Sequence, residues 1–235
     1  MTSVLFLMTS LAYGYTKVKR DGDKTKMKTE HTTVAAGVFA AMNFVGAGVA
    51  LFLACGYGGD PIAVLCQGIQ VTLGVSFGTA SLLFNLLIIG IALLVSKKNL
   101  GVGTVAYALV SGYFIDFYSF LLKQIHFVDW SLYVKIICYF VGIVFLAETL
   151  SILIFLDCGM NGVDAIVYFL EEKLKIPYQV IRTTFDVTAV LTGFLLGGTV
   201  GWGTLICALA TGTLVKKLVL VQKNIFKYRK IAVKG

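Results

Sequence analysis

Seven polar residues interrupt or border long apolar stretches of the chain, and their side chains are the ones able to bind a solute or move a proton. They are Asn43, Asp60, Asp116, Glu148, Asp164, Arg182 and Asp186. A charged side chain inside a membrane span costs on the order of 3 kcal/mol on insertion scales, so each needs a reason to be there. Arg182 and Asp186 are four residues apart, and on a helix they share a face and can pair.

Two interpretations of these residues remain open. In the first, they line a polar cavity that binds a solute or relays protons. In the second, Arg182 is a counter-ion for Asp186 and Glu148 and holds two helices in register. Asp60 and Asp164 have a further alternative, because an aspartate before a short helix can simply cap its free amides, and Asp60 precedes Pro61. Capping is favoured for both over contact with a substrate or cation.

No pattern typical of an enzyme or a metal protein is found. G-x-S-x-G, H-E-x-x-H and Walker sequences are absent, and the histidines, His31 and His126, both fall in expected loops. The five cysteines form no C-x-x-C pair and are expected to pack as small hydrophobic residues. We therefore predict no catalytic residue, no metal, no cofactor and no enzymatic activity.

The composition is that of a polytopic helical membrane protein. Of the residues, 58% are hydrophobic and 14% charged, and the mean hydropathy is +0.88. The apolar blocks do not alternate as they do in a transmembrane β-barrel. The net charge is +8, and most of the basic residues lie before the first long apolar run or after the last. This placement predicts cytoplasmic termini and attraction to anionic lipid, and it argues against a nucleic acid as partner.

A twelve-residue block occurs twice, one hundred residues apart. Both copies read G-x-G-T-x-x-x-A-L-x-[S/T]-G, with the marked residues Gly101, Gly103, Thr104, Gly112, Gly201, Gly203, Thr204 and Gly212. Each copy follows an acidic turn, so the chain is predicted to contain two copies of one unit. The blocks lack the strand context of a nucleotide-binding loop, and we expect their glycines to allow close helix packing and their threonines to cap helices.

The apolar runs predict an all-α protein with six spans and two short helices. The spans are expected at residues 34–55, 76–95, 104–122, 132–155, 178–196 and 204–220, and the short helices at 62–73 and 165–173. Residues 4–15 could form an interfacial helix or a truncated span. A signal-peptide core is less favoured there, because no basic segment precedes them and no cleavage site follows. Residues 16–33 are expected to be a basic linker.

The order of these elements predicts an inverted repeat of three plus three spans. If the short helices re-enter the membrane without crossing it, the second copy enters from the opposite side. The lysine-rich loops then all face the cytoplasm. The expected divisions are an N-terminal segment and linker (1–33), repeat 1 (34–122), repeat 2 (132–220) and a basic cytoplasmic tail (221–235).

The chain resembles the YczE/YitT class of bacterial integral membrane proteins in its two acidic turns and its two G-x-G-T blocks. The resemblance covers about residues 34–220, whereas the first 30 residues do not share the pattern. The residues that match are Gly59, Asp60, Gly101, Gly103, Thr104, Gly112, Asp116, Gly162, Asp164, Arg182, Asp186, Gly201, Gly203, Thr204 and Gly212. The resemblance implies a protein of the bacterial inner membrane with a transport-related role, and it names no substrate.

The predicted function is therefore a transporter or permease for a small polar or anionic solute, with coupling to protons as an option. A substrate-capture or scaffold subunit of a larger membrane complex is the alternative, and a lipid-modifying membrane enzyme ranks third. Association into a homo-oligomer is compatible with either of the first two.

Overall fold

A computed structural model describes residues 24–95, 102–156 and 162–232, and these ranges contain helices and turns but no strand. The predicted all-α class is confirmed. The described elements are α2 (Lys24–Cys55), α3 (Pro61–Leu73), α4 (Phe77–Val95), α5 (Val102–Gln124), the 3-10 turn η2 (Phe127–Asp129), α6 (Leu132–Leu156), α7 (Gly162–Leu174), α8 (Tyr178–Leu195) and α9 (Trp202–Ala232).

Four of these helices are long and apolar enough to cross a membrane. The qualifying stretches are Ala36–Cys55, Phe77–Val95, Leu132–Ile154 and Trp202–Gln222, in α2, α4, α6 and α9. Length and composition thus identify four of the six predicted spans among the described residues. α5 and α8 are 23 and 18 residues long but more polar, since α5 carries Asp116 and α8 carries both Arg182 and Asp186.

Most predicted helix ends agree with the structure to within a few residues, and three do not. α2 begins at Lys24, so part of the expected linker is helical. α9 continues to Ala232 through most of the expected tail. α7 begins at Gly162, which places Asp164 in its first turn and not in the preceding loop. The predictions for residues 4–15 and for 157–161 lie outside the described residues.

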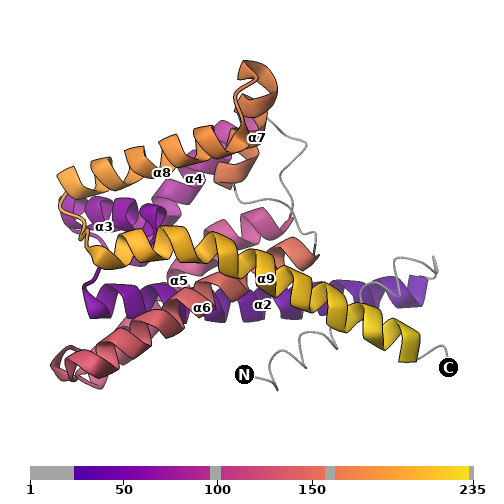
Figure 1. Ribbon diagram of the computed structural model, residues 1–235, viewed down its shortest axis with the longest axis horizontal. Helices are drawn as coiled ribbons and strands as arrows, with labels where there is room; N and C mark the ends of the chain where they lie inside the picture. The colour runs from indigo at the N-terminus through magenta and orange to yellow at the C-terminus, as the bar shows by residue number, and fades with distance from the viewer. Residues whose placement is uncertain (1–23, 96–101, 157–161, 233–235) are drawn as a thin grey trace.

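α2 and α6 pack against each other as an antiparallel pair (Figure 1). Contacts join residue 41 of α2 to 149 of α6, residue 48 to 142, and residue 55 to 135. The two helices therefore run in opposite directions. α5 packs on the flank of α2 and α9 on the flank of α6. The start of α2 and the end of α9 project from the same end of the molecule.

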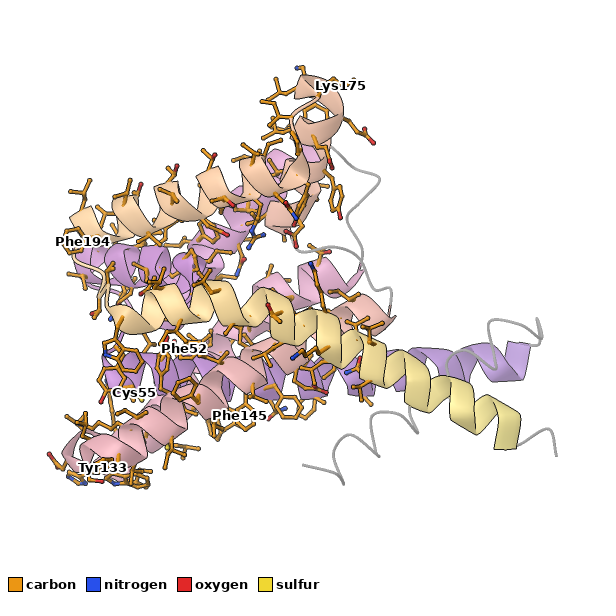
Figure 2. The ribbon with its side chains drawn as sticks, in the orientation of Figure 1. Phe52, Cys55, Tyr133, Phe145, Lys175 and Phe194 are labelled. Carbon is orange, nitrogen blue, oxygen red and sulfur yellow. The ribbon has the colours of Figure 1, made fainter. Side chains whose placement is uncertain are left out.

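The short helices lie at opposite ends and each packs on the other half of the chain. α3 packs on α8, and α7 packs on α4. In Figure 2, Lys175 precedes α8 and Phe194 lies near its end, on the side of the molecule where Cys55 terminates α2. Pro61 begins α3. Gly74, which adopts φ 65°, ends the helix and donates its N–H to Gln70 O.

Three helix pairs cross where glycine faces glycine. These contacts are Gly48 with Gly142 between α2 and α6, Gly68 with Gly193 between α3 and α8, and Gly78 with Gly112 between α4 and α5. Without a Cβ, the backbones approach closely, which stabilises helix pairs in lipid where apolar burial gives little driving force. The predicted role of Gly112 in close packing is therefore confirmed.

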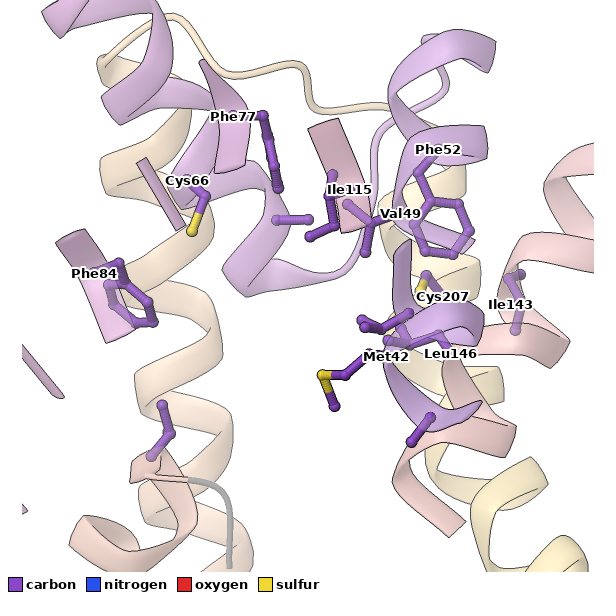
Figure 3. Close-up of a cluster of buried hydrophobic side chains, with 14 of the residues drawn as sticks. Met42, Val49, Phe52, Cys66, Phe77, Phe84, Ile115, Ile143, Leu146 and Cys207 are labelled. Atoms are coloured by element: carbon purple, nitrogen blue, oxygen red, sulfur yellow. The ribbon is translucent and has the colours of Figure 1, made fainter. Parts of the chain in front are cut away.

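Buried apolar side chains fill the spaces around these crossings. Figure 3 shows two groups of them. One surrounds the pair α2 and α6 and includes Phe52 and Ile143, and the other lies around α3 and α4 and includes Cys66 and Phe84. The two short helices are thus enclosed by packed side chains on their inner faces, where buried residues such as Val64 and Val167 point.

Candidate functional site

Arg182 connects two carboxylates where α7 meets α8. Its Nη1 atom lies 2.5 Å from Oδ1 of Asp164, and its Nε donates to Oδ2 of Asp186 over 3.3 Å. Tyr178 donates its hydroxyl to the same Asp164 oxygen at 2.8 Å. The side chains of Arg182, Asp164 and Asp186 are 27%, 29% and 30% exposed, so the network is partly buried. The predicted pairing of Arg182 with Asp186 is confirmed.

Asp164 does not act as a cap. Capping was the favoured prediction, but the residue lies inside the first turn of α7, and its side chain points to Tyr178 and Arg182 of α8. Its negative charge near the start of α7 is still favourable for the helix dipole. Asp164 therefore joins α7 to α8 as a charged partner and belongs to the candidate site.

Asp60 occupies the cap position of α3, in the turn that follows α2. Its backbone is extended, with φ −64° and ψ 159°, but its side chain makes no capping hydrogen bond. Burial raises the pKa of the Asp60 carboxyl to about 6, while the amide of Ala63 and the Arg182 guanidinium oppose the rise and Asp186 adds to it. Asp60 is thus electrostatically coupled to the charged pair on α8, although it comes from the other half of the chain.

The second G-x-G-T block holds the turn that carries Asp60. Gly203 donates its N–H to Tyr57 O at 3.1 Å, and Gly58, at φ +87°, lies against Thr204 Oγ1 and the backbone of Gly201. Thr204 Oγ1 also accepts the N–H of Gly201 at 3.4 Å, as the third residue of a helix does in a capping box. The block is therefore both a helix start and a support for the opposite acidic turn, a role that the sequence did not predict.

Asp116 acts as a helix cap supplied by a neighbouring helix. Its Oδ1 accepts the backbone N–H of Gly78 at 2.8 Å, and its Oδ2 accepts the hydroxyl of Ser76 at 2.6 Å. Ser76 in turn accepts the N–H of Thr79 at 3.1 Å. Asp116 on α5 thus satisfies the start of α4, and the structure separates it from the candidate site.

We expect Asp116→Ala to lower stability and to leave binding at the candidate site intact. Two charge-assisted hydrogen bonds to the start of α4 are lost, at a cost of about 1–2 kcal/mol. Thermal unfolding of the purified protein in detergent measures the loss, and Asp129→Ala, which removes an exposed carboxylate from η2, is the matched control. An unchanged melting temperature combined with lost solute binding would return Asp116 to the site.

Glu148 and Asn43 also have structural partners. Glu148 is buried on α6, and its Oε1 accepts the side-chain amide of Gln222 on α9 at 3.2 Å. The expected contact between Arg182 and Glu148 is not found among the described side chains. Asn43 donates to Phe39 O at 2.9 Å and accepts the hydroxyl of Tyr118 at 3.1 Å, so it joins α2 to α5.

Several residues of the site were not predicted from the sequence. Tyr178 lies one turn before Arg182, and the four-residue spacing of Tyr178, Arg182 and Asp186 was the signal that could have found it. Glu171 accepts the backbone N–H of Tyr178 at 3.1 Å and supports the start of α8. Tyr139 of α6 is fully buried and coupled electrostatically to Asp60, but nothing in the local sequence distinguishes it from a core tyrosine.

The site therefore joins one cation with three carboxylates. Asp60 comes from residues 34–122, and Asp164, Arg182 and Asp186 come from residues 132–220. Arg182 is engaged by Asp164 and Asp186, which leaves Asp60 without a hydrogen-bonded cation in the described part of the chain. In the same part of the chain, no three His, Cys, Asp or Glu side chains converge as ligands of a metal ion. The arrangement suits the recognition of a charged group or the binding of a proton.

The chain is similar to three uncharacterized bacterial proteins, one of which is described as a membrane protein. It is 25% identical over 187 residues to an uncharacterized protein of Haemophilus influenzae, covering 80% of this chain and 83% of that one. It is 25% identical to the uncharacterized membrane protein YczE of Bacillus subtilis, covering 61% of this chain and 65% of YczE. The uncharacterized protein YyaS of Bacillus subtilis is also 25% identical, with 72% and 83% covered. No solved structure matches the chain.

Residues 33–219 match a family of unknown function, DUF6198. This range includes the first three apolar spans in full, the fourth span as far as residue 219, and every residue of the candidate site. The relative YczE also supports the predicted resemblance to YczE-type membrane proteins. The chain is thus an integral membrane protein that belongs to the DUF6198 family of unknown function.

Proposed function

We propose that the protein is a transporter or permease that moves a small polar solute through a site between its two halves. The observation that carries the proposal is that α3, which begins directly after Asp60 of the first half, packs on α8 of the second half, where Arg182 and Asp186 act electrostatically on the Asp60 carboxyl. A site built from both halves changes when the halves move against each other. That movement is how secondary transporters expose a site to alternate sides of the membrane.

The arrangement of the helices supports an inverted repeat of residues 34–122 and 132–220. Helices α2 and α6 are antiparallel, and the short helices α3 and α7 lie at opposite ends of the molecule (Figure 1). The packing of α3 on α8 has a counterpart in the packing of α7 on α4, as a two-fold relation between the halves requires. In this proposal α5 and α8 complete six spans, and their polar side chains face other helices.

The proposed topology places both termini in the cytoplasm of a bacterial cell, with the chain in the inner membrane. α2 starts and α9 ends on the same side of the molecule, and basic residues gather in both segments. Lys97, Lys98, Lys173 and Lys175 then also fall on the cytoplasmic side under the positive-inside rule. The outer side is left with the uncharged turn between α8 and α9 and with the end of α5 and its connection to α6, where Lys123 and Asp129 lie.

A purely structural role would account for Arg182 less completely. One carboxylate is enough to neutralise a guanidinium, yet Asp164 and Asp186 both pair with Arg182, and Arg182 in turn acts on Asp60. Asp60 lies in a turn held by a glycine-rich support, and its carboxyl is partly buried with no hydrogen-bonded cation among the described residues. A carboxyl whose pKa is raised by burial beside other charged groups is typical of binding sites.

The test is solute flux through the purified full-length chain in proteoliposomes. A panel of small polar solutes is applied on a solid-supported membrane, and we expect at least one of them to give a current or uptake that empty liposomes lack. Asp186→Asn should lower the initial rate by about tenfold or more, because Arg182 loses a charged partner. Asp129→Asn is the control for loss of a carboxylate. Unchanged flux in Asp186→Asn, or no flux for any solute, contradicts the proposal.

A further inference from the structure

We propose that the chain moves as two four-helix bundles, which turn against each other about a joint at one end of the molecule. The first bundle contains α2, α5, α6 and α9, and the second contains α3, α4, α7 and α8. Each bundle takes two helices from residues 34–122 and two from 132–220, so their movement also changes the packing between the two halves. The inference rests on the proposed function for the purpose of the movement, and it identifies the parts that move.

The packing of the helices divides them into these two bundles. In the first, α2 packs on α5 and α6, and α6 packs on α9. In the second, α3 packs on α4 and α8, and α7 packs on the same two helices. In the described part of the chain, α4 and α5 form the one extensive helix contact between the bundles. Figure 1 shows the second bundle in the upper part of the view and the first in the lower part.

Polar side chains join helices within each bundle. In the first bundle, Gln222 of α9 donates to Glu148 of α6. In the second, Arg182 of α8 binds Asp164 of α7. Asp116 of α5 crosses the boundary, where it accepts hydrogen bonds from the start of α4. The bond that crosses therefore lies at the same α4–α5 contact that joins the bundles, and this contact is named the anchor.

Two connections between the bundles pack against each other and form the joint. They are residues 56–60, between α2 and α3, and residues 196–201, between α8 and α9. Gly203 donates its N–H to Tyr57 O, and a Cβ at Gly201 would lie 2.5 Å from the same oxygen. Gly56 and Gly197 have φ 71° and 92°, and glycine can change such a backbone angle at little steric cost. Hinges of moving domains are short loop segments of this kind.

The second bundle is anchored on one side and free on the other. At the anchor, α4 and α5 cross with Gly78 against Gly112. On the other side, α8 and α9 are barely in contact in the described residues, and they diverge from the joint in Figure 1. A turn of the second bundle about the joint and the anchor therefore changes the separation of α8 and α9 most. Because Arg182 and Asp186 lie on α8, the same turn changes which groups face them.

Distances between spin labels, measured by pulsed electron paramagnetic resonance in detergent, test the proposal without requiring transport. The labels are attached to p-acetylphenylalanine at exposed positions of the full-length chain, so the native cysteines stay unchanged. The boundary pair joins Val180 of α8 to Leu220 of α9. Two control pairs use the same label positions within one bundle, Val71 with Val180 and Ile137 with Leu220. We expect one narrow distance for each control pair, and for the boundary pair two distances or a distribution at least about twice as wide.

Asp116→Ala tests the anchor in the same three labelled pairs. It removes the hydrogen bonds that cross the boundary, so the boundary pair should widen further while both control pairs stay unchanged. Asp129→Ala, which removes an exposed carboxylate from η2, should change none of the three.

The outcomes separate this proposal from the proposed transport. A boundary distribution as narrow as those of the control pairs overturns the movement of two bundles, and so does a control pair as wide as the boundary pair. Asp116→Ala that widens all three pairs overturns the anchor, because the loss then affects the whole fold. Flux together with a narrow boundary pair would leave transport in place and assign it to another movement. A wide boundary pair without any flux overturns transport alone.

Discussion

Arg182→Ala is expected to give the largest loss of both stability and flux. The change removes the partner of Asp164 and Asp186 together and leaves their carboxylates facing each other and Asp60 in a partly buried space. Removing one partner of a buried ion pair costs about 3–5 kcal/mol, and partial exposure of these side chains reduces the expected loss to about 2–3 kcal/mol. Thermal unfolding in detergent measures the first effect, and flux in proteoliposomes at equal protein measures the second.

Two further variants separate the charge of Arg182 from its role in folding. Arg182→Lys keeps the charge but cannot reach two carboxylates with separate nitrogens, so we expect intermediate stability. The triple variant Arg182→Gln, Asp164→Asn, Asp186→Asn removes the network as a whole, which should restore most of the stability because no uncompensated charge remains. If the restored protein also regained flux, the network would be a structural lock, and Asp60 alone would remain as a candidate for the site.

The helices of this protein could be predicted from the sequence because lipid imposes a simple rule on them. Every apolar run of sufficient length must be helical, so the ends of α3, α4 and α6 follow from where the runs begin and stop. Pro61 and Gly74 mark the two ends of α3 through backbone preferences that need no tertiary contact. The ends of α2 and α9 could not be predicted in this way, because both helices extend beyond the apolar residues.

The partners of the polar residues could not be predicted from local sequence. Asp116 caps α4 from a distance of 38 residues, and Asp60 and Arg182 are separated by more than half of the chain. Only the four-residue spacing of Arg182 and Asp186 carried a local signal, and that pair was found. The repeat indicated that two units exist, but not that the G-x-G-T block of one unit supports the acidic turn of the other.

The two halves of the molecule differ at one pair of equivalent contacts. α4 and α5 pack closely through Gly78 and Gly112 and are joined by Asp116, whereas α8 and α9, their counterparts, are barely in contact in the described residues. Position 216, which corresponds to Asp116 in the repeat, is a lysine and cannot cap α8. Identical motifs thus have unequal structural roles, which a pair of matched substitutions can measure.

We expect Gly112→Ala to destabilise the protein strongly and Gly212→Ala to leave its stability unchanged or slightly raised. A Cβ at Gly112 would lie 2.5 Å from Gly78 O and 3.0 Å from Gly78 C, both backbone atoms, so α4 and α5 must separate at a cost of about 1–3 kcal/mol. A Cβ at Gly212 would meet nothing within 4 Å among the described residues, and alanine favours the helix by up to about 1 kcal/mol.

Thermal unfolding of the two variants side by side gives the comparison, with Gly90→Ala, also in open space on α4, as a second neutral control. Both motif glycines end the same twelve-residue block, so any difference between them arises from the packing of their helices and not from the motif itself. Equal destabilisation by both substitutions would mean that α8 and α9 pack against each other as closely as α4 and α5 do, and the described asymmetry between the halves would be wrong.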